Sequence, residues 1–112
     1  MKPLEELRAE IQAELADALR FRKMGNEGRA RVCARRAAGR AIGWYVEANG
    51  LAEAHSNALE HLRWFTNHLH ADVRFREAAA RLTTKLKPDG RLPFEQDLLD
   101  DANSIIDFCL GS

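Results

Sequence analysis

Apolar side chains recur at intervals of three and four residues through most of this chain, and that spacing restricts the possible folds more than any other feature. An apolar stripe with this period covers one face of an α-helix. Alanine, leucine, arginine and glutamate are abundant, and no stretch alternates apolar with polar residues for long enough to indicate a β-strand. The sequence therefore predicts an all-α fold.

Helix-ending residues divide the chain into five stretches. The first opens at Pro3 and ends near Met24, where Gly25 and Asn26 are typical of a tight turn between antiparallel helices. The other four are expected at about 29–48, from between 51 and 57 to about 70, from the cap Asp72 to the break at 88–90, and after Pro93. No linker is long enough to separate two domains. We therefore expect one domain, residues 1–112, folded as a compact up-and-down bundle of four to five helices.

Four of these stretches carry apolar stripes that predict their buried faces. The first stripe comprises Leu4, Leu7, Ile11, Leu15 and Leu19. The third comprises Leu51, Ala54, Ala58, Leu62, Phe65 and Leu69. The fourth comprises Phe75, Ala78, Ala79, Leu82 and Leu86. The last stripe comprises Phe94, Leu98, Ala102, Ile105 and Cys109.

The charge and cysteine content exclude several classes of protein. Lys plus Arg and Asp plus Glu each total 17, so the formal net charge is zero, which argues against nucleic-acid binding by overall attraction alone. Two cysteines argue against a disulfide-built secreted scaffold. No uncharged run approaches the roughly 18 apolar residues that a membrane span requires. We expect a cytoplasmic protein that does not contact a membrane.

The neutral total conceals two segments of opposite charge. The second helix carries Arg29, Arg31, Arg35, Arg36 and Arg40, and no acidic residue lies between Arg29 and Val46. The last stretch carries Glu95, Asp97, Asp100, Asp101 and Asp107, with no lysine or arginine. Two interpretations are open: the arginines pair with carboxylates of a neighbouring helix or a partner, or they bind phosphate oxygens of RNA or a nucleotide, which the guanidinium fork matches.

Rotation by 100° per residue gives the second helix two polar rows and two apolar sides. Arg29, Arg36 and Arg40 form the row that we select as the candidate ligand-binding site. A broad arc of small and aromatic residues is expected to be buried: Ala30, Cys33, Ala34, Ala37, Ala38, Ala41, Trp44 and Tyr45. The opposite side is a narrow strip of Val32, Gly39, Gly43 and Val46. This strip predicts either a second helix contact within the chain or the interface of a homodimer.

Trp64 is a further candidate interface residue. On the third helix it is expected to project away from the stripe of Leu62, Phe65 and Leu69. An exposed tryptophan is often part of an interface. The alternative is that the fourth or fifth helix covers it.

Metal and thiol chemistry are not indicated. Cys33 and Cys109 stand alone among apolar neighbours, as buried small hydrophobic residues do. All four histidines fall between residues 55 and 70, but His61 and His68 are separated by about 10.5 Å of helix rise, too far to share one ion directly. The sequence predicts no metal site and no cofactor.

The order of features resembles the HEPN superfamily of small helical bundles. The similar parts are 17–19 before the Gly25 turn, the alanine-rich second helix, and a closing helix at 100–108. The resemblance implies a bundle that dimerises; many members act on RNA without metal or belong to toxin–antitoxin systems, and others assist nucleotidyltransferases. Catalytic members carry Arg followed by His after four to six residues, a spacing that Arg63 and His68 match. The resemblance then implies His68 as general acid or base and Arg63 as the group that stabilises the transition state.

These observations give three functional hypotheses. The first is a non-enzymatic, HEPN-like bundle that acts through protein contacts as a homodimer, with RNA or a nucleotide on the Arg29/Arg36/Arg40 row. The second is a metal-independent ribonuclease that uses Arg63 and His68, whose side chains diverge by about 140° on a continuous helix. The third is an adaptor built from helical hairpins.

Overall fold

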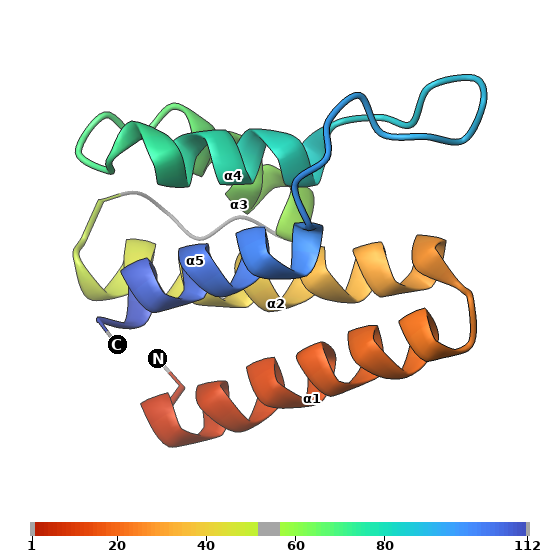
Figure 1. Cartoon of the computed structure of the whole chain (residues 1–112). Helices are drawn as coiled ribbons and strands as arrows, with labels where there is room; N and C mark the ends of the chain where they lie inside the picture. Colours follow the sequence, from red (N-terminus) through yellow and green to blue (C-terminus); the bar gives the residue numbers. More distant parts are fainter. Residues whose placement is uncertain (1, 52–56, 112) are drawn as a thin grey trace.

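The computed structural model describes residues 2–51 and 57–111, and it confirms the all-α bundle. Five helices lie in the described ranges (Figure 1): α1 Leu4–Lys23, α2 Glu27–Ala48, α3 Ala58–Thr66, α4 Val73–Thr83 and α5 Leu98–Leu110. None of these helices combines the length and the apolar character needed to cross a membrane.

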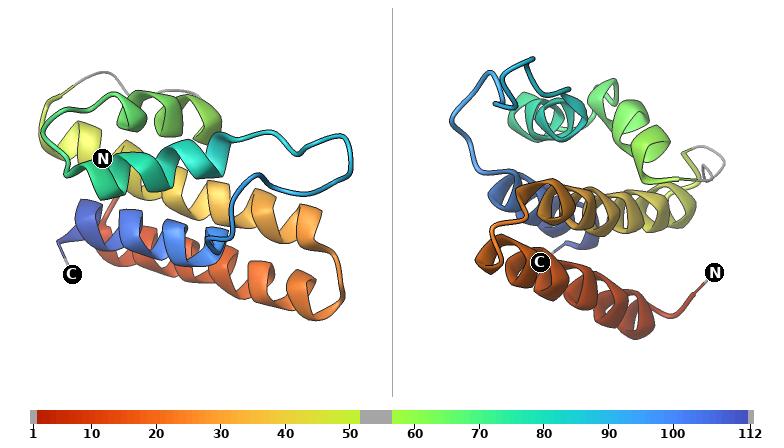
Figure 2. Two further views of the ribbon diagram at one scale, coloured as in Figure 1. Left: turned by 45° about the horizontal axis from the view of Figure 1, so that its top comes forward. Right: turned by 90° about the vertical axis from the view of Figure 1, so that its right-hand side faces the viewer.

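α2 is the central helix, and every other helix packs against it. α1 covers it from one side, and the α3–α4 pair covers it from the opposite side (Figure 1). α5 lies beside α2 and also packs against α4. In the two further views, α5 and α3 lie on opposite sides of α2 (Figure 2).

The predicted helix ends are confirmed where glycine or a capping side chain defines them. Gly25 has a φ of +77°, a left-handed conformation that glycine adopts without strain, and the Asn26 side chain accepts a hydrogen bond from the Arg29 amide. Asn49 ends α2, and the Asp72 side chain caps α4. These caps fix the α1–α2 hairpin and the start of α4.

The predicted apolar stripes are wrong at four positions, each of which is exposed. α3 ends at Thr66 instead of near His70, and Leu69 is 80% exposed in the following turn. Leu86 lies beyond the end of α4, and Leu51 lies before the start of α3. Leu19 lies within α1 but is exposed there. Ala54 lies outside the described residues. Apolar spacing alone continued α3 and α4 past their ends, because a leucine in a turn fits the same period as one in a helix.

The core is centred on α2. Its largest fully buried side chains are Phe65, Ile11, Ile42, Leu62, Leu82, Ile105 and Val46. The predicted buried arc of α2 is confirmed for its small residues, all of which are nearly inaccessible, while Trp44 and Tyr45 are half-buried against the core. Small residues at these positions let several helices approach α2 closely.

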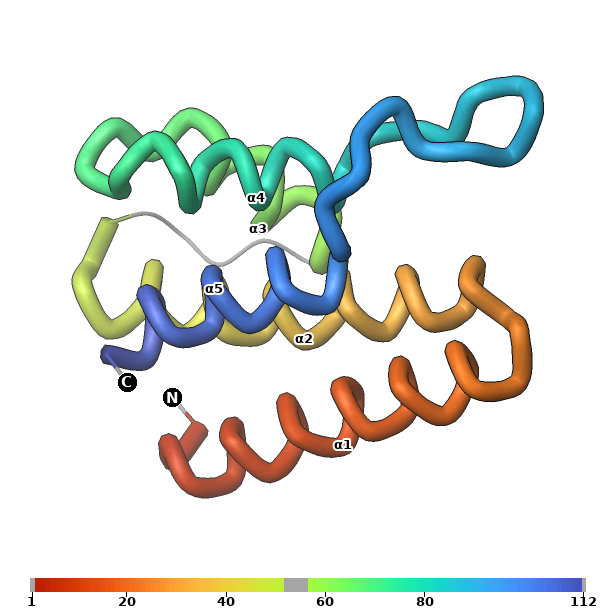
Figure 3. The backbone as a smooth tube through the Cα atoms, viewed as in Figure 1, coloured from red at the N-terminus to blue at the C-terminus, as the bar shows by residue number. Residues whose placement is uncertain are grey.

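Residues 84–97 form a long connection that passes over the end of the bundle near the α1–α2 turn (Figure 3). A tight turn closes its tip, where the Lys87 amide bonds the Arg91 carbonyl at 2.7 Å and Gly90 takes a φ of +81°. Arg22 of α1 holds its far end through two hydrogen bonds to Asp97, at 2.8 and 3.0 Å. The connection is therefore fixed at both its tip and its end.

Candidate functional site

The glycine strip of α2 is covered by α3 of the same chain. A Cβ placed on Gly39 would lie 2.6 Å from the Cβ of Ala58, and one on Gly43 would lie 3.0 Å from the His61 ring. Val46 is fully buried, whereas Val32 stays 39% exposed. The second helix contact predicted for this strip is thus present within one chain, and it explains why glycine occurs twice inside a helix.

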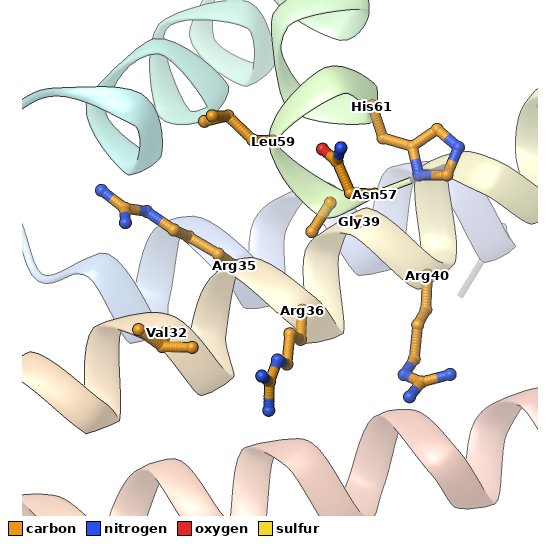
Figure 4. A pocket seen from close by; sticks show the side chains of 9 residues that line it. Val32, Arg35, Arg36, Gly39, Arg40, Asn57, Leu59 and His61 are labelled. Carbon is orange, nitrogen blue, oxygen red and sulfur yellow. The ribbon is translucent and has the colours of Figure 1, made fainter. Parts of the chain in front are cut away.

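Two hollows lie next to this contact and run along α2. The first, of about 620 Å³, is lined by Val32, Arg35, Arg36, Gly39 and Arg40 of α2 and by Asn57, Ala58, Leu59 and His61 (Figure 4). The second, of about 410 Å³, is lined by Lys2, Leu7, Arg40, Gly43, Trp44, Glu47 and His61. The two hollows share Arg40 and His61, so they are neighbours along α2, and we call the pair the α2 groove.

The five arginines of α2 have different surroundings. Arg40 points toward α1 and bonds Glu10 at 3.0 Å and Glu14 at 3.5 Å (Figure 4). Arg35 points toward α4, where its Nε donates to the carbonyl of Leu82 near the helix end. Such a cation at a helix C-terminus is favourable.

The predicted row of Arg29, Arg36 and Arg40 is therefore divided. Arg29 lies outside the α2 groove, with its guanidinium 5.5 Å from the centre of the Phe21 ring. Arg36 is exposed and has no carboxylate partner among the described residues. Of the predicted row, Arg36 is the residue whose charge is available at the groove.

The acidic C-terminal segment does not neutralise the arginines of α2. Two of its acids, Asp97 and Asp101, bind Arg22 of α1 and Arg81 of α4, with N···O distances of 2.8 Å in each pair. Hydrogen bonds from Arg22 lower the pKa of Asp97. Among the described residues, Asp97 and Asp101 thus pair with arginines of α1 and α4 and not with those of α2.

The charge of the first hollow is positive. None of its lining residues is a carboxylate, and Arg35 and Arg36 both belong to it. Burial lowers the pKa of Arg35, and the nearby charge of Arg31 lowers it further. Arg35 and Arg31 are thus like charges held close together, a situation that an anion at this surface would relieve.

Arg63 and His68 do not form a common site in the structure. Arg63 is exposed on α3, whereas His68 follows the end of α3 and is buried. The His68 Nε2 lies 3.0 Å from the Tyr45 hydroxyl, and its ring stacks on Trp64 with centroids 4.7 Å apart. Burial lowers the pKa of His68, and so does the neighbouring His70. These contacts are those of a core histidine that joins α2 to the end of α3.

Trp64 is half-buried, and the residue that stacks on it is His68, from the turn after its own helix. Trp64 also lines a shallow surface hollow together with Glu60, Arg63 and Asn67. One face of the Trp64 ring is thus covered by His68, and this contact involves neither α4 nor α5. Its role at an interface stays a prediction.

Both cysteines are buried, as predicted. Burial raises the pKa of Cys33 and of Cys109, so both side chains remain thiols near neutral pH. Across the part of the chain that the structure describes, no three His, Cys, Asp or Glu side chains are grouped closely enough to hold a metal ion.

Sequence reasoning selected α2 as the candidate site helix but missed the other wall of its groove. That wall is Asn57, the N-cap of α3, with Leu59 and His61 of α3, a short helix whose own apolar stripe does not identify its packing partner. The spacing of Gly39 and Gly43, four residues apart, was the signal that another helix approaches here. Comparison of the chain with protein-family models, curated proteins and solved structures found no match.

Proposed function

We propose that this protein is a binding module whose α2 groove holds an acidic, amphipathic helix of a partner protein. The observation that carries the proposal is the first hollow, where two guanidinium groups with no carboxylate partner among the described residues border an apolar surface. The resemblance to HEPN proteins and the homodimer stay predictions, and the proposal does not depend on either.

The shape of the groove supports a helical occupant. It extends along α2 from Val32 to Glu47, which is about 22 Å at 1.5 Å per residue. Ala58 and His61 of α3 fill the space that Gly39 and Gly43 leave, so the groove runs beside this helix contact. A helix of about four turns would lie in such a groove with its apolar face against Val32 and Leu59, a common mode of peptide recognition.

The charges of the groove support an acidic occupant. The planar guanidinium of Arg36 can bind a carboxylate with two parallel hydrogen bonds. Arg35 uses its Nε for Leu82, and no described residue accepts a hydrogen bond from its two terminal nitrogens. An acidic residue of the partner on each side of its apolar stripe would meet these two arginines.

A protein partner fits this groove better than RNA. Single-stranded RNA binds most strongly where bases stack on aromatic rings, and the groove offers the half-buried Trp44 in its second hollow and the buried His61 as its only rings. Glu10 and Glu14 of α1 lie beside Arg40 and would repel a polyanion that continues along the groove, so the acidic residues of a partner helix are expected at the first hollow only. A short helix needs only local charge complementarity.

Fluorescence anisotropy with labelled peptides tests the proposal. The probe is a helical peptide of about 16 residues with leucines on one face and glutamates beside them, long enough to span the groove. We expect saturable binding to the wild type and an affinity at least about tenfold lower for Arg36→Glu, a loss of about 1.4 kcal/mol. Arg74→Gln, on α4 outside the groove, is the matched control and should bind like the wild type.

Three further probes separate the alternatives. A peptide of the same composition with its leucines scattered around the helix, and one with lysine in place of glutamate, should both bind weakly. If a labelled oligouridylate binds more tightly than the acidic peptide and loses its affinity in Arg36→Glu, the ligand is RNA. Equal binding of all peptides, or unchanged binding by Arg36→Glu, would contradict the proposal, as would sedimentation showing that a second copy already fills the groove.

A further inference from the structure

The 84–97 connection lies at the end of the bundle opposite the chain termini (Figure 1). A separate cavity, of about 460 Å³, is lined by residues of this connection together with residues of α1, α2 and α5. It shares no lining residue with the α2 groove. Its volume falls within the range of small-molecule sites. We call it the loop cavity.

The walls of the loop cavity are mainly apolar. They include Ala30 and Ala34 of α2, Leu86 and Leu92 of the connection, and Leu98 and Leu99 of α5. Leu86 is 43% exposed, so its side chain lines the cavity without being covered by the protein. A ligand with an apolar body would remove this leucine surface from water, at about 25 cal/mol per Å².

One charged group of the loop cavity lacks a partner in the protein. Arg31 lines it from α2, and its Nε is buried with no hydrogen-bond acceptor among the described residues. A buried polar atom left without a partner costs about 1–3 kcal/mol. Arg35, four residues further along the helix, lies near enough that the charge of Arg31 opposes its own.

The acids that line the loop cavity do not neutralise Arg31. Glu27 and Asp97 both bond Arg22, with N···O distances of 3.0 and 2.8 Å. Glu95 is exposed, where water screens its charge. Arg31 therefore lines a cavity of mixed apolar and charged walls, and no carboxylate among the described residues is bonded to its guanidinium.

We propose that the loop cavity binds a small amphiphilic carboxylate, with the apolar body between the connection and α2 and the carboxylate at the guanidinium of Arg31. A carboxylate offers two oxygens to the fork of donors, so it makes a charge-assisted pair in surroundings that have already lost much of their water. Each methylene buried against the leucines adds up to about 0.8 kcal/mol. An uncharged ligand of the same length keeps only the second of these contributions.

Octanoate and 1-octanol are the matched probes, because they share an eight-carbon chain and differ in the charge of the head group. Each is titrated into the full-length protein while the leucine methyl signals are followed by ¹H–¹³C NMR. We expect the methyls of Leu86 and Leu92 to shift on addition of octanoate, and octanoate to bind about tenfold more tightly than octanol. Arg31→Gln should remove that preference, and Arg74→Gln should keep it.

Leu86→Asp provides an independent variant, since Leu86 is already partly exposed and the change does not disturb the core. A carboxylate at the mouth of the loop cavity should weaken octanoate more than octanol. Three results would overturn the proposal: no shift of the Leu86 and Leu92 methyls, equal affinity for the two probes, or an octanoate preference that survives in Arg31→Gln. The last would mean that water alone satisfies Arg31.

Discussion

Replacing Gly39 by alanine tests how closely α3 is seated on α2, and so tests the wall of the α2 groove. The added Cβ would lie 2.6 Å from the Cβ and 2.7 Å from the Cα of Ala58. Carbon atoms pack favourably at about 3.5–4.0 Å, so the two helices would have to separate by about 1 Å at this point. Ala58 has no flexible side chain that could move aside.

The size of the effect follows from two opposing contributions. Alanine in a helix interior is favoured over glycine by about 1 kcal/mol. Overpacking a fitted contact costs about 1–3 kcal/mol, and this contact involves backbone, so we take the upper part of that range. We expect Gly39→Ala to lower the free energy of unfolding by about 1–2 kcal/mol, which corresponds to a fall in Tm of at least about 4 °C.

Two other glycines of α2 provide matched controls for the same chemical change. At Gly43 the new Cβ would lie 3.0 Å from the His61 ring, a longer contact and one made with a side chain instead of backbone, so we expect a smaller loss of stability than for Gly39→Ala. At Gly28 its nearest neighbour would be the Asn26 Oδ1 at 3.8 Å, so alanine should stabilise slightly. Urea denaturation followed by circular dichroism ranks the three variants. If Gly39→Ala is as stable as Gly28→Ala, α3 does not pack on α2 as described.

Three further predictions concern the buried polar groups. Asp101→Asn should lower the free energy of unfolding by about 3 kcal/mol, because it leaves Arg81 without its carboxylate in a largely buried site, whereas the exposed neighbour variant Asp100→Asn should be nearly neutral in the same denaturation assay. The folded-state pKa of His68 lies below its ordinary value of about 6.5, so the unfolded chain takes up its proton first and stability should decrease as the pH falls from about 7 to 5; the slope should be smaller in His68→Gln, and an NMR titration of the ring that gives a pKa above the ordinary value would refute this. Because His68 is packed against Tyr45 and Trp64, we expect labelled RNA to be cleaved no faster by the wild type than by His68→Ala, and a loss of cleavage in the variant would instead support the ribonuclease hypothesis.

The helices could be predicted because their ends are determined locally. Gly25, Asn26 and Asp72 act through the conformation of one residue or one side-chain hydrogen bond, and such signals are visible in a short window of sequence. The end of α3 has a weaker signal, because Asn67 is its C-cap but no glycine or proline follows it and the apolar spacing continues to Leu69. Past this end, His68 lies against Tyr45, a residue 23 positions earlier.

The site could be predicted only in part, because it is formed by two helices. The arginines of α2 were identified from their number, but their pairing depends on which helix lies beside each one. Arg40 faces α1, which supplies Glu10 and Glu14, while Arg36 has no carboxylate partner in the described structure. Rotation about a helix axis gives the direction of a side chain but not the identity of its neighbour.

The net charge of zero does not describe the charge near α2, because the acids and bases of this chain form ion pairs at particular places in the fold. Asp97 and Asp101, which could have neutralised α2, instead bind Arg22 and Arg81, arginines that come from helices other than α2. In each pair an arginine outside α2 neutralises the carboxylate, which therefore does not pair with an arginine of α2. Arg36 at the first hollow therefore remains available to an external anion even though the chain as a whole is neutral. A substitution that frees Asp97, such as Arg22→Gln, should then weaken octanoate in the loop cavity and leave the acidic peptide in the α2 groove unaffected, which would separate the two sites by experiment.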